Sequence, residues 1–200
     1  MSARVLIVGG AGVFGRRLAE GLRATAETEL IIAGRSADRA LRAADALGGE
    51  HVVLDRALTT SADLTALQAD IVIDAGGPFQ GADYSFARTV LEAGAHYVDL
   101  ADARDFVAGF AALDAVARAQ GKAAITGASS TPALTHSALD ALCAGWRRVD
   151  AVRAGIAPGN RAPKGRSLVE AILSRAGAPA RVWEGGAWTT RRGWSRSSEK

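Results

Sequence analysis

The sequence has little of what disulfide-bonded, zinc-binding or membrane-spanning proteins require. It contains 200 residues and a single cysteine, Cys143, which excludes an internal disulfide and a zinc site built from several cysteines. No apolar stretch approaches the roughly 18 residues that a membrane helix needs. The apolar run after Arg4 is too short for the core of a signal peptide. We therefore expect a cytoplasmic protein with no membrane span.

Lysine is also scarce, and the basic residues are unevenly distributed. Only three of the 24 basic residues are lysines. Residues 1–150 carry 14 basic and 18 acidic side chains, whereas residues 151–200 carry 10 basic and 3 acidic ones. The net charge of +3 thus combines a mildly acidic region with a basic tail. The tail contains no recognisable nucleic-acid-binding motif, so we expect no nucleic-acid partner.

Short apolar runs alternate with helical patterns through the first three quarters of the chain. The expected strands are residues 4–8, 29–33, 51–54, 70–74, 96–100 and 123–126. Helical patterns follow at residues 14–22, 37–47, 61–67, 86–93, 106–117 and 132–146. Apolar strands without polar alternation are typical of a parallel sheet that is covered on both faces. The pattern predicts an α/β fold over residues 1–147, a doubly wound parallel sheet of the Rossmann type.

The remaining residues, 148–200, show a different pattern. They are expected to form, in order, a strand (149–156), an Arg-rich loop (157–166), a helix (167–176) and a β-hairpin (181–183 with 187–190). Three of the four tryptophans lie in the last 20 residues. Because an isolated hairpin is only marginally stable in water, these aromatic side chains need a surface to pack on. We predict that residues 148–200 begin a second, α+β domain.

The first expected strand leads directly into a glycine-rich loop. Gly10, Gly12 and Gly15 have the GxGxxG spacing, and they lie between a strand and a helix as dinucleotide binding requires. The first glycine permits a tight turn, the second lets the backbone approach a pyrophosphate, and the third lets the helix pack on the strand. We infer that these glycines bind a dinucleotide together with the intervening residues Ala11, Val13 and Phe14. The alternative is a glycine turn in a domain that binds no nucleotide.

The end of the second expected strand favours NADP(H) over NAD(H). NAD-binding domains carry an acidic residue about 20 positions after the glycines, which binds the ribose 2′-hydroxyl. Here Arg35 stands at that distance from Gly15, and Ser36 follows it. A guanidinium binds a 2′-phosphate through paired hydrogen bonds, and a hydroxyl adds another. The alternative is a solvated arginine at the start of the next helix.

Two further strand ends are expected to line the same ligand. Asp55 closes the third strand, where it would either contact the adenine edge or cap the strand. The fourth strand is followed by Ala75, Gly76, Gly77, Pro78 and Phe79, at the edge where open α/β sheets bind ligands. Glycines there would let the backbone approach the nicotinamide half of a cofactor. The alternative is an ordinary Gly-Pro turn.

No residue stands out as the proton donor for hydride transfer. The candidates near the carboxyl ends of strands are Asp99, Tyr97 and His136. Each has a competing structural role: Asp99 as a loop cap, Tyr97 as a core residue and His136 as a helix cap. The Tyr-x-x-x-Lys pair of short-chain dehydrogenases is missing, and the three histidines form no metal-binding pattern. The catalytic assignment stays open, and we expect no metal.

Several motifs follow one another in the order found in a known family. The chain contains GGAGVFGRRLAEGL, IIAGRS, DAGGPFQ, LEAGAHYVDLAD and ITGASSTPAL. Over about residues 4–150 the chain therefore resembles the N-terminal NADP-binding domain of saccharopine dehydrogenase/reductase-like proteins. A later segment, SLVEAILSRAGAPARVWEGGAW, is similar to the start of the second domain in bacterial members.

This resemblance implies an NADP(H)-dependent oxidoreductase that acts on a small molecule, for example one derived from an amino acid or a keto acid. By position it implies a cofactor site formed by Gly10, Gly12, Val13, Phe14, Gly15, Arg35, Ser36 and residues 76–79. It also implies a second domain that supplies much of the substrate site and the contact of a homodimer. That domain is longer than 50 residues in the family, so we expect the chain to stop inside it. The alternative is a non-catalytic NADP(H)-binding module or sensor, or a fragment that is inactive without its substrate domain.

Overall fold

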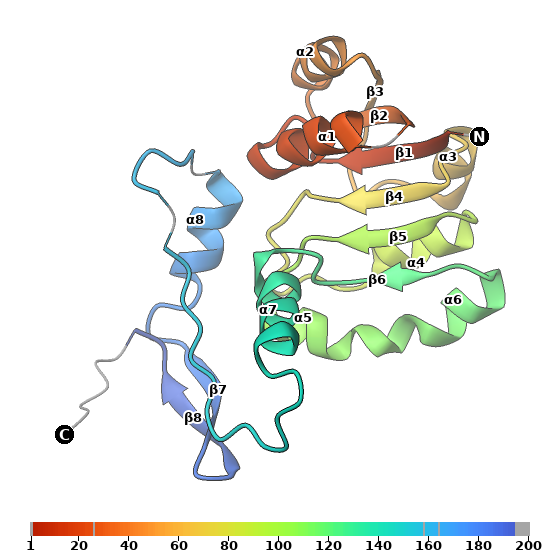
Figure 1. Cartoon of the computed structure of the whole chain (residues 1–200). Helices are drawn as coiled ribbons and strands as arrows, with labels where there is room; N and C mark the ends of the chain where they lie inside the picture. The colour runs from red at the N-terminus through yellow and green to blue at the C-terminus, as the bar shows by residue number, and fades with distance from the viewer. Residues whose placement is uncertain (1, 26, 158, 164, 195–200) are drawn as a thin grey trace. The chain divides into compact units, whose positions relative to one another are not determined.

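A six-stranded parallel sheet forms the centre of the larger part of the protein (Figure 1). The computed structural model describes residues 2–25, 27–157, 159–163 and 165–194. The strands lie in the order β3-β2-β1-β4-β5-β6, and each neighbouring pair is parallel. Their bounds are β1 (Ala3–Val8), β2 (Thr28–Gly34), β3 (Glu50–Val53), β4 (Ile71–Asp74), β5 (His96–Asp99) and β6 (Ala124–Ile125). The predicted doubly wound α/β fold is confirmed.

The central strand β1 marks the point where the order of the strands reverses. Val8 at its carboxyl end lies opposite Ala33 of β2 on one side and Asp74 of β4 on the other. Asp74 lies in turn opposite Asp99 of β5. Because parallel strands end at the same edge, the loops that follow β1, β2, β4 and β5 emerge together. In open α/β sheets, ligands bind outside such a switch point.

Helices cover both faces of the sheet. The helices α1 (Val13–Thr25) and α2 (Ala37–Leu47) pack on the face that includes Ile7 and Ile32. The opposite face is covered by α3 (Ser61–Ala66), α4 (Ser85–Glu92), α5 (Arg104–Gly109) and α6 (Asp114–Gln120). Its core includes Leu6, Val72 and Tyr97. This double burial explains why the strands are apolar throughout instead of alternating with polar residues.

The helical pattern predicted over residues 106–117 corresponds to three pieces. The helix α5 ends at Gly109, a 3₁₀ turn spans Phe110–Leu113, and α6 follows. Glycine is a poor helix former, and Gly109 also lies against the hydroxyl of Tyr84, which an added Cβ would approach to 2.5 Å. The tighter turn keeps Phe106 and Phe110 in the core on either side of this break.

Two helix ends differ from the prediction. The helix predicted over residues 61–67 ends at Ala66, and Thr60 caps its start, because the Thr60 hydroxyl accepts the Asp63 amide and the Asp63 carboxylate accepts the Thr60 amide. The helix predicted over residues 132–146 is shorter, since a π-helical turn (Ser130–Leu134) leads into α7 (Thr135–Leu142). The chain leaves the helix before Gly145, whose φ is +81°, and Trp146 lies outside α7.

The strand predicted at residues 149–156 is wrong. This segment is irregular, and no strand of the described chain pairs with it. A strand is stable only when a neighbour satisfies its backbone groups, and the edge strand β6 has just two paired residues. The alternation of apolar residues over this segment was therefore not sufficient to predict a strand of the sheet.

The chain divides into two compact units, Met1–Pro163 and Lys164–Lys200. The second contains α8 (Arg166–Leu173) and an antiparallel hairpin of β7 (Pro179–Glu184) and β8 (Ala187–Arg192). The hairpin was predicted, and the rings of Trp183 and Trp188 meet across it edge to face with their centroids 5.3 Å apart. A functional domain boundary at residues 147/148 and a homodimer through residues 148–200 stay predictions.

Candidate functional site

The glycine positions of the loop after β1 leave little space for a side chain. A Cβ on Gly15 would overlap the carbonyl oxygen of Gly9 and lie 2.7 Å from the Cα of Gly10. A Cβ on Gly12 would lie 3.0 Å from the same Gly9 oxygen, and the Gly12 amide donates to that oxygen at 2.8 Å. The loop is thus a tight backbone turn against the start of α1. Of the glycines assigned here, Gly15 has the strictest steric requirement.

The amino end of α1 offers hydrogen-bond donors beside this turn. The amide of Arg16 makes the first helical hydrogen bond, to the carbonyl of Gly12 at 3.0 Å. The amides of Val13, Phe14 and Gly15 precede it, so they belong to the helix start, where amides lack helical acceptors. Together with the helix dipole they fit a phosphate group. The glycine cradle and the helix start therefore fit the pyrophosphate of a dinucleotide.

The side chains at the end of β2 are exposed. Arg35 and Ser36 both face solvent, and Ser36 is the N-cap residue of α2 without a side-chain capping bond. A further arginine, Arg39, donates from Nη2 to the carbonyl oxygen of Ala11 at 3.3 Å. Arg39 was not among the predicted site residues, although its spacing of four positions from Arg35 in a helix indicates a shared face. Arg39 thus contacts the glycine loop, and Arg35 and Ser36 lie exposed between β2 and α2.

Asp55 takes part in the turn that follows β3. Its Oδ1 accepts the Ala57 amide at 3.0 Å, and its carbonyl accepts the Thr59 hydroxyl at 2.7 Å. The structure therefore shows the capping role that was the alternative to contact with the adenine edge. The adenine contact itself stays a prediction.

The loop of residues 75–79 meets the glycine loop directly. Gly9 has φ of +76°, and a Cβ on it would lie 2.9 Å from the Cα of Gly76 and 3.0 Å from the carbonyl oxygen of Ala75. The amide of Ala75 donates to the carbonyl of Val8 at 2.9 Å. Phe79 is buried in the core, with its ring centroid 5.3 Å from that of Phe106. The fold therefore brings together two segments that were assigned separately to one ligand.

An ion pair that no sequence motif indicates lies next to this loop. The Arg56 Nη1 donates to Asp74 Oδ2 at 2.7 Å, and Asp74 is almost completely buried. The other carboxylate oxygen of Asp74 accepts the Gly76 amide at 2.9 Å. The guanidinium carbon of Arg56 lies 5.6 Å from the centroid of the Phe79 ring. Arg56 belongs to no motif, so only the fold reveals its position.

Asp99 is fully buried at the carboxyl end of β5. Its Oδ1 accepts the amides of Ala101 and Gly127 at 2.9 and 2.8 Å and the hydroxyl of Thr126 at 2.9 Å. Within the described residues its Oδ2 has no hydrogen-bond partner. Burial raises the pKa of Asp99, these three donors oppose the rise, and the charge of Asp74 adds to it. Asp99 thus caps the loops after β5 and β6.

Tyr97 and His136 lie in different surroundings. Tyr97 is buried among the aromatic residues of the core, with its ring stacked on Phe110 at 5.9 Å. Burial raises the pKa of its phenol, and the carboxylates of Asp74 and Asp99 raise it further. His136 is exposed on α7. The fold places Tyr97 two residues from Asp99 in β5, whereas His136 comes from a separate helix.

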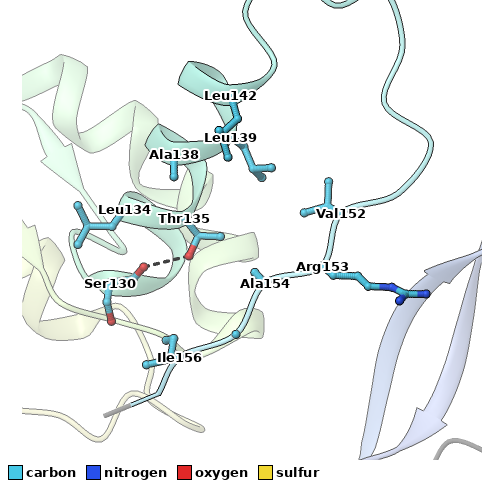
Figure 2. Close-up of a pocket in the computed structure, with 11 residues that line it drawn as sticks. Ser130, Leu134, Thr135, Ala138, Leu139, Leu142, Val152, Arg153, Ala154 and Ile156 are labelled. Carbon is cyan, nitrogen blue, oxygen red and sulfur yellow. Dashed lines mark hydrogen bonds between the residues drawn. The ribbon is translucent and has the colours of Figure 1, made fainter. Parts of the chain in front are cut away.

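A depression of about 310 Å³ lies between α7 and the irregular segment at residues 152–156 (Figure 2). Leu134, Ala138 and Leu139 line one wall, and Val152 and Ile156 line the other. Figure 2 shows the side chain of Arg153 directed away from α7. No predicted site residue lines this depression. Its apolar walls contrast with the polar edge around β1 and β4.

No described helix is long and apolar enough to cross a membrane. Within the described residues, no group of three or more His, Cys, Asp or Glu side chains is placed to hold a metal ion. The polar edge around β1, β2 and β4 instead combines backbone amides, a glycine cradle and arginines. These features define an NAD(P)-binding domain of the Rossmann class.

Comparison with protein families identifies the kind of domain. Residues 5–141 match the family described as the saccharopine dehydrogenase NADP binding domain. The chain belongs to this family, and the resemblance predicted from the motifs is confirmed. A comparison with curated proteins found no match.

Among the similar solved structures, one shares the fold of the larger unit with a TM-score above 0.5. Saccharopine dehydrogenase (L-Glu forming) from Saccharomyces cerevisiae is 17% identical with a TM-score of 0.55, over 70% of this chain and 31% of that one. Biliverdin reductase from Synechocystis sp. PCC 6803, in complex with biliverdin and NADP+, is 26% identical with a TM-score of 0.48, over 62% and 37%. An NAD binding oxidoreductase from Klebsiella pneumoniae is 22% identical with a TM-score of 0.47, over 62% and 34%. The chain spans about a third of the length of these structures.

Proposed function

We propose that this chain binds NADP(H) in preference to NAD(H) and is the cofactor-binding part of an oxidoreductase of the saccharopine dehydrogenase type. The observation that carries the cofactor preference is the exposed pair Arg35 and Ser36 at the end of β2, where NAD-specific domains place a carboxylate. Arg39 adds a second cation beside the glycine loop. An arginine holds a 2′-phosphate through charge-assisted hydrogen bonds that a ribose hydroxyl cannot match.

The other parts of the cofactor are assigned to the loops at the carboxyl edge of the parallel sheet. In this proposal the backbone of residues 10–15 binds the pyrophosphate, and residues 75–79 border the nicotinamide half. Asp55 stays a candidate for contact with the adenine. The bound nicotinamide supplies hydride transfer, so the protein has to orient a small-molecule substrate and move a proton.

Asp99, Tyr97 and His136 stay the candidate proton donors. Asp99 lies at the carboxyl end of β5, where it is fully buried, and its Oδ2 has no hydrogen-bond partner among the described residues. Tyr97 is enclosed by the aromatic core, and His136 belongs to α7.

The cofactor preference is tested by titrating the chain with NADPH and NADH and following binding by calorimetry. Replacing Arg35 by alanine should cost roughly 1.5–3 kcal/mol of NADPH affinity, about 10- to 150-fold, because it removes a charged hydrogen-bond donor. NADH affinity should change little. Arg88→Ala, at an exposed position on α4, is the matched control and should leave both affinities unchanged.

Unchanged NADPH binding by the Arg35→Ala variant, or tighter binding of NADH than of NADPH by the unmodified chain, would contradict the proposal. A second candidate is a binding module without catalysis, which is favoured by the burial of the candidate acids Asp99 and Tyr97. The two are separated by measuring NADPH oxidation with a panel of amino-acid and keto-acid substrates. Turnover by the 200-residue chain excludes the binding module.

A further inference from the structure

Arg56 connects three parts of the sheet edge. It lies in the loop after β3, it donates to the Asp74 carboxylate at the end of β4, and its guanidinium lies over the ring of Phe79. About a quarter of its side chain is exposed, whereas the side chain of Asp74 is 2% exposed. A guanidinium that is partly enclosed between a carboxylate and an aromatic face is held in one orientation.

Asp74 depends on this arginine for its charge balance. A buried carboxylate is costly unless it is paired and hydrogen-bonded, and Arg56 is the cation in contact with it. The second oxygen of Asp74 holds the amide of Gly76. The Arg56–Asp74 pair thus determines the orientation of the peptide that begins the loop of residues 75–79.

Gly76 packs closely against Gly9, so the position of the loop of residues 75–79 affects the position of the glycine loop. A Cβ on Gly76 would lie 3.1 Å from Asp74 Oδ1, and a Cβ on Gly9 would lie 2.9 Å from the Cα of Gly76. With so little space, a displacement of residues 75–79 has to displace Gly9 or open a gap beside it. Arg35 and Arg39, by contrast, lie on the opposite side of the glycine loop, towards β2.

We propose that Arg56 is a positioning residue for the nicotinamide half of the cofactor, because it holds residues 75–79 in place through Asp74 and Phe79. The proposal rests on the proposed function, since it requires that a dinucleotide binds at this edge. It assigns to Arg56 no contact with the 2′-phosphate. Loss of Arg56 should therefore weaken binding of the whole cofactor and spare its adenosine half.

The test compares two ligands on the full chain, NADPH and adenosine 2′,5′-bisphosphate, the second of which lacks the nicotinamide half. For Arg56→Met we expect NADPH affinity to fall about tenfold, as for a small displacement of a binding loop. Affinity for adenosine 2′,5′-bisphosphate should stay within about twofold. Arg56→Lys keeps the positive charge without the planar guanidinium, and it should show a smaller loss for NADPH alone.

Arg4→Met is the matched control, since Arg4 also forms ion pairs and its side chain is 26% exposed, compared with 28% for Arg56. Arg4 lies near the amino ends of the strands, so Arg4→Met should leave both affinities unchanged. Equal weakening of the two ligands by Arg56→Met, or no weakening of either, overturns the positioning role. If the unmodified chain binds neither ligand, the proposed function is overturned instead, and this proposal falls with it.

Discussion

The two sides of the glycine loop use charge in opposite ways. On the β2 side, Arg35, Ser36 and Arg39 are exposed at the surface. On the β4–β5 side, Asp74 and Asp99 are buried, and their oxygens hold backbone amides of the loops that follow. We call the first group the β2 flank, and the second group, with Arg56, the β4–β5 flank.

The exposed charges of the β2 flank are suited to binding a ligand, whereas the buried charges of the β4–β5 flank are suited to holding the backbone in place. Exposed charged side chains contribute little to folding stability, because water solvates them equally well in the unfolded chain. They remain available to a ligand. Buried carboxylates that accept several amides determine the course of the backbone, and losing them leaves the amides without acceptors. Substitutions on the β2 flank should therefore change affinity, whereas substitutions on the β4–β5 flank should change stability and loop position.

The largest expected effect is on the β4–β5 flank. Asp99→Ala leaves two amides and one hydroxyl without their buried acceptor. We expect the free energy of unfolding to fall by about 3 kcal/mol or more, since each buried donor that is left without an acceptor costs about 1–3 kcal/mol. Urea denaturation measures this change. A loss below about 1 kcal/mol would show that the three bonds do not hold the loops.

Asp99→Asn keeps the acceptor oxygen and removes the acid, which tests the pH dependence. Burial raises the pKa of Asp99 above its ordinary value of 3.8, so the folded chain retains a proton that the unfolded chain releases. The contribution of Asp99 to the free energy of unfolding should therefore decrease as the pH rises above 3.8 and level off above the raised pKa. Asp99→Asn should lack this decrease. If thermal unfolding of the unmodified chain and of Asp99→Asn depends on pH in the same way, the raised pKa of Asp99 is refuted.

The next effect lies at Gly15, between the two flanks. Gly15→Ala places a Cβ against the backbone of Gly9 and Gly10, neither of which has a flexible side chain that could move away. We expect a loss of about 1–3 kcal/mol in stability, as for overpacking, together with weaker binding of both NADPH and adenosine 2′,5′-bisphosphate.

Gly21→Ala in the same helix is the matched control, because an added Cβ there meets nothing within 4 Å. It should raise stability by about 0.5–1 kcal/mol, as alanine does in helix interiors, and leave binding unchanged. Calorimetric titration and thermal unfolding together distinguish the two variants. Equal behaviour of Gly15→Ala and Gly21→Ala would mean that the turn tolerates a side chain.

The smallest effect is expected on the β2 flank. Arg39 makes one hydrogen bond to the Ala11 carbonyl and is otherwise exposed, so Arg39→Ala should change the midpoint of thermal unfolding little. NADPH affinity should fall by about 0.5–1.5 kcal/mol, the usual contribution of a single hydrogen bond. NADH affinity should stay constant. An equal loss of affinity for NADPH and NADH would contradict a contact with the 2′-phosphate, and it would indicate that Arg39 contacts a part that both cofactors share.

Most of the sheet was predictable because its strands are short, apolar and separated by helices that end at glycine. The helix at Ala37–Leu47 and the hairpin were also predicted, since an uninterrupted helical composition and a Gly-Gly turn are local signals. The strand predicted at residues 149–156 was wrong, because strand pairing depends on a neighbouring strand that no local sequence pattern describes. Arg56 was missed for the same reason, as its partner Asp74 is 18 positions away in the sequence.

The sequence by itself determined the fold class, the family and the position of the glycine loop, because periodicity and glycine spacing act over a few neighbouring residues. The tertiary structure alone decided which groups meet at the edge: Gly9 against Gly76, Arg39 beside Ala11, and Arg56 between Asp74 and Phe79. These contacts join loops from different strands, and their geometry follows from the order and register of the parallel sheet. Burial then assigns the roles, since a carboxylate enclosed by amides supports the backbone while an exposed arginine remains available to a ligand.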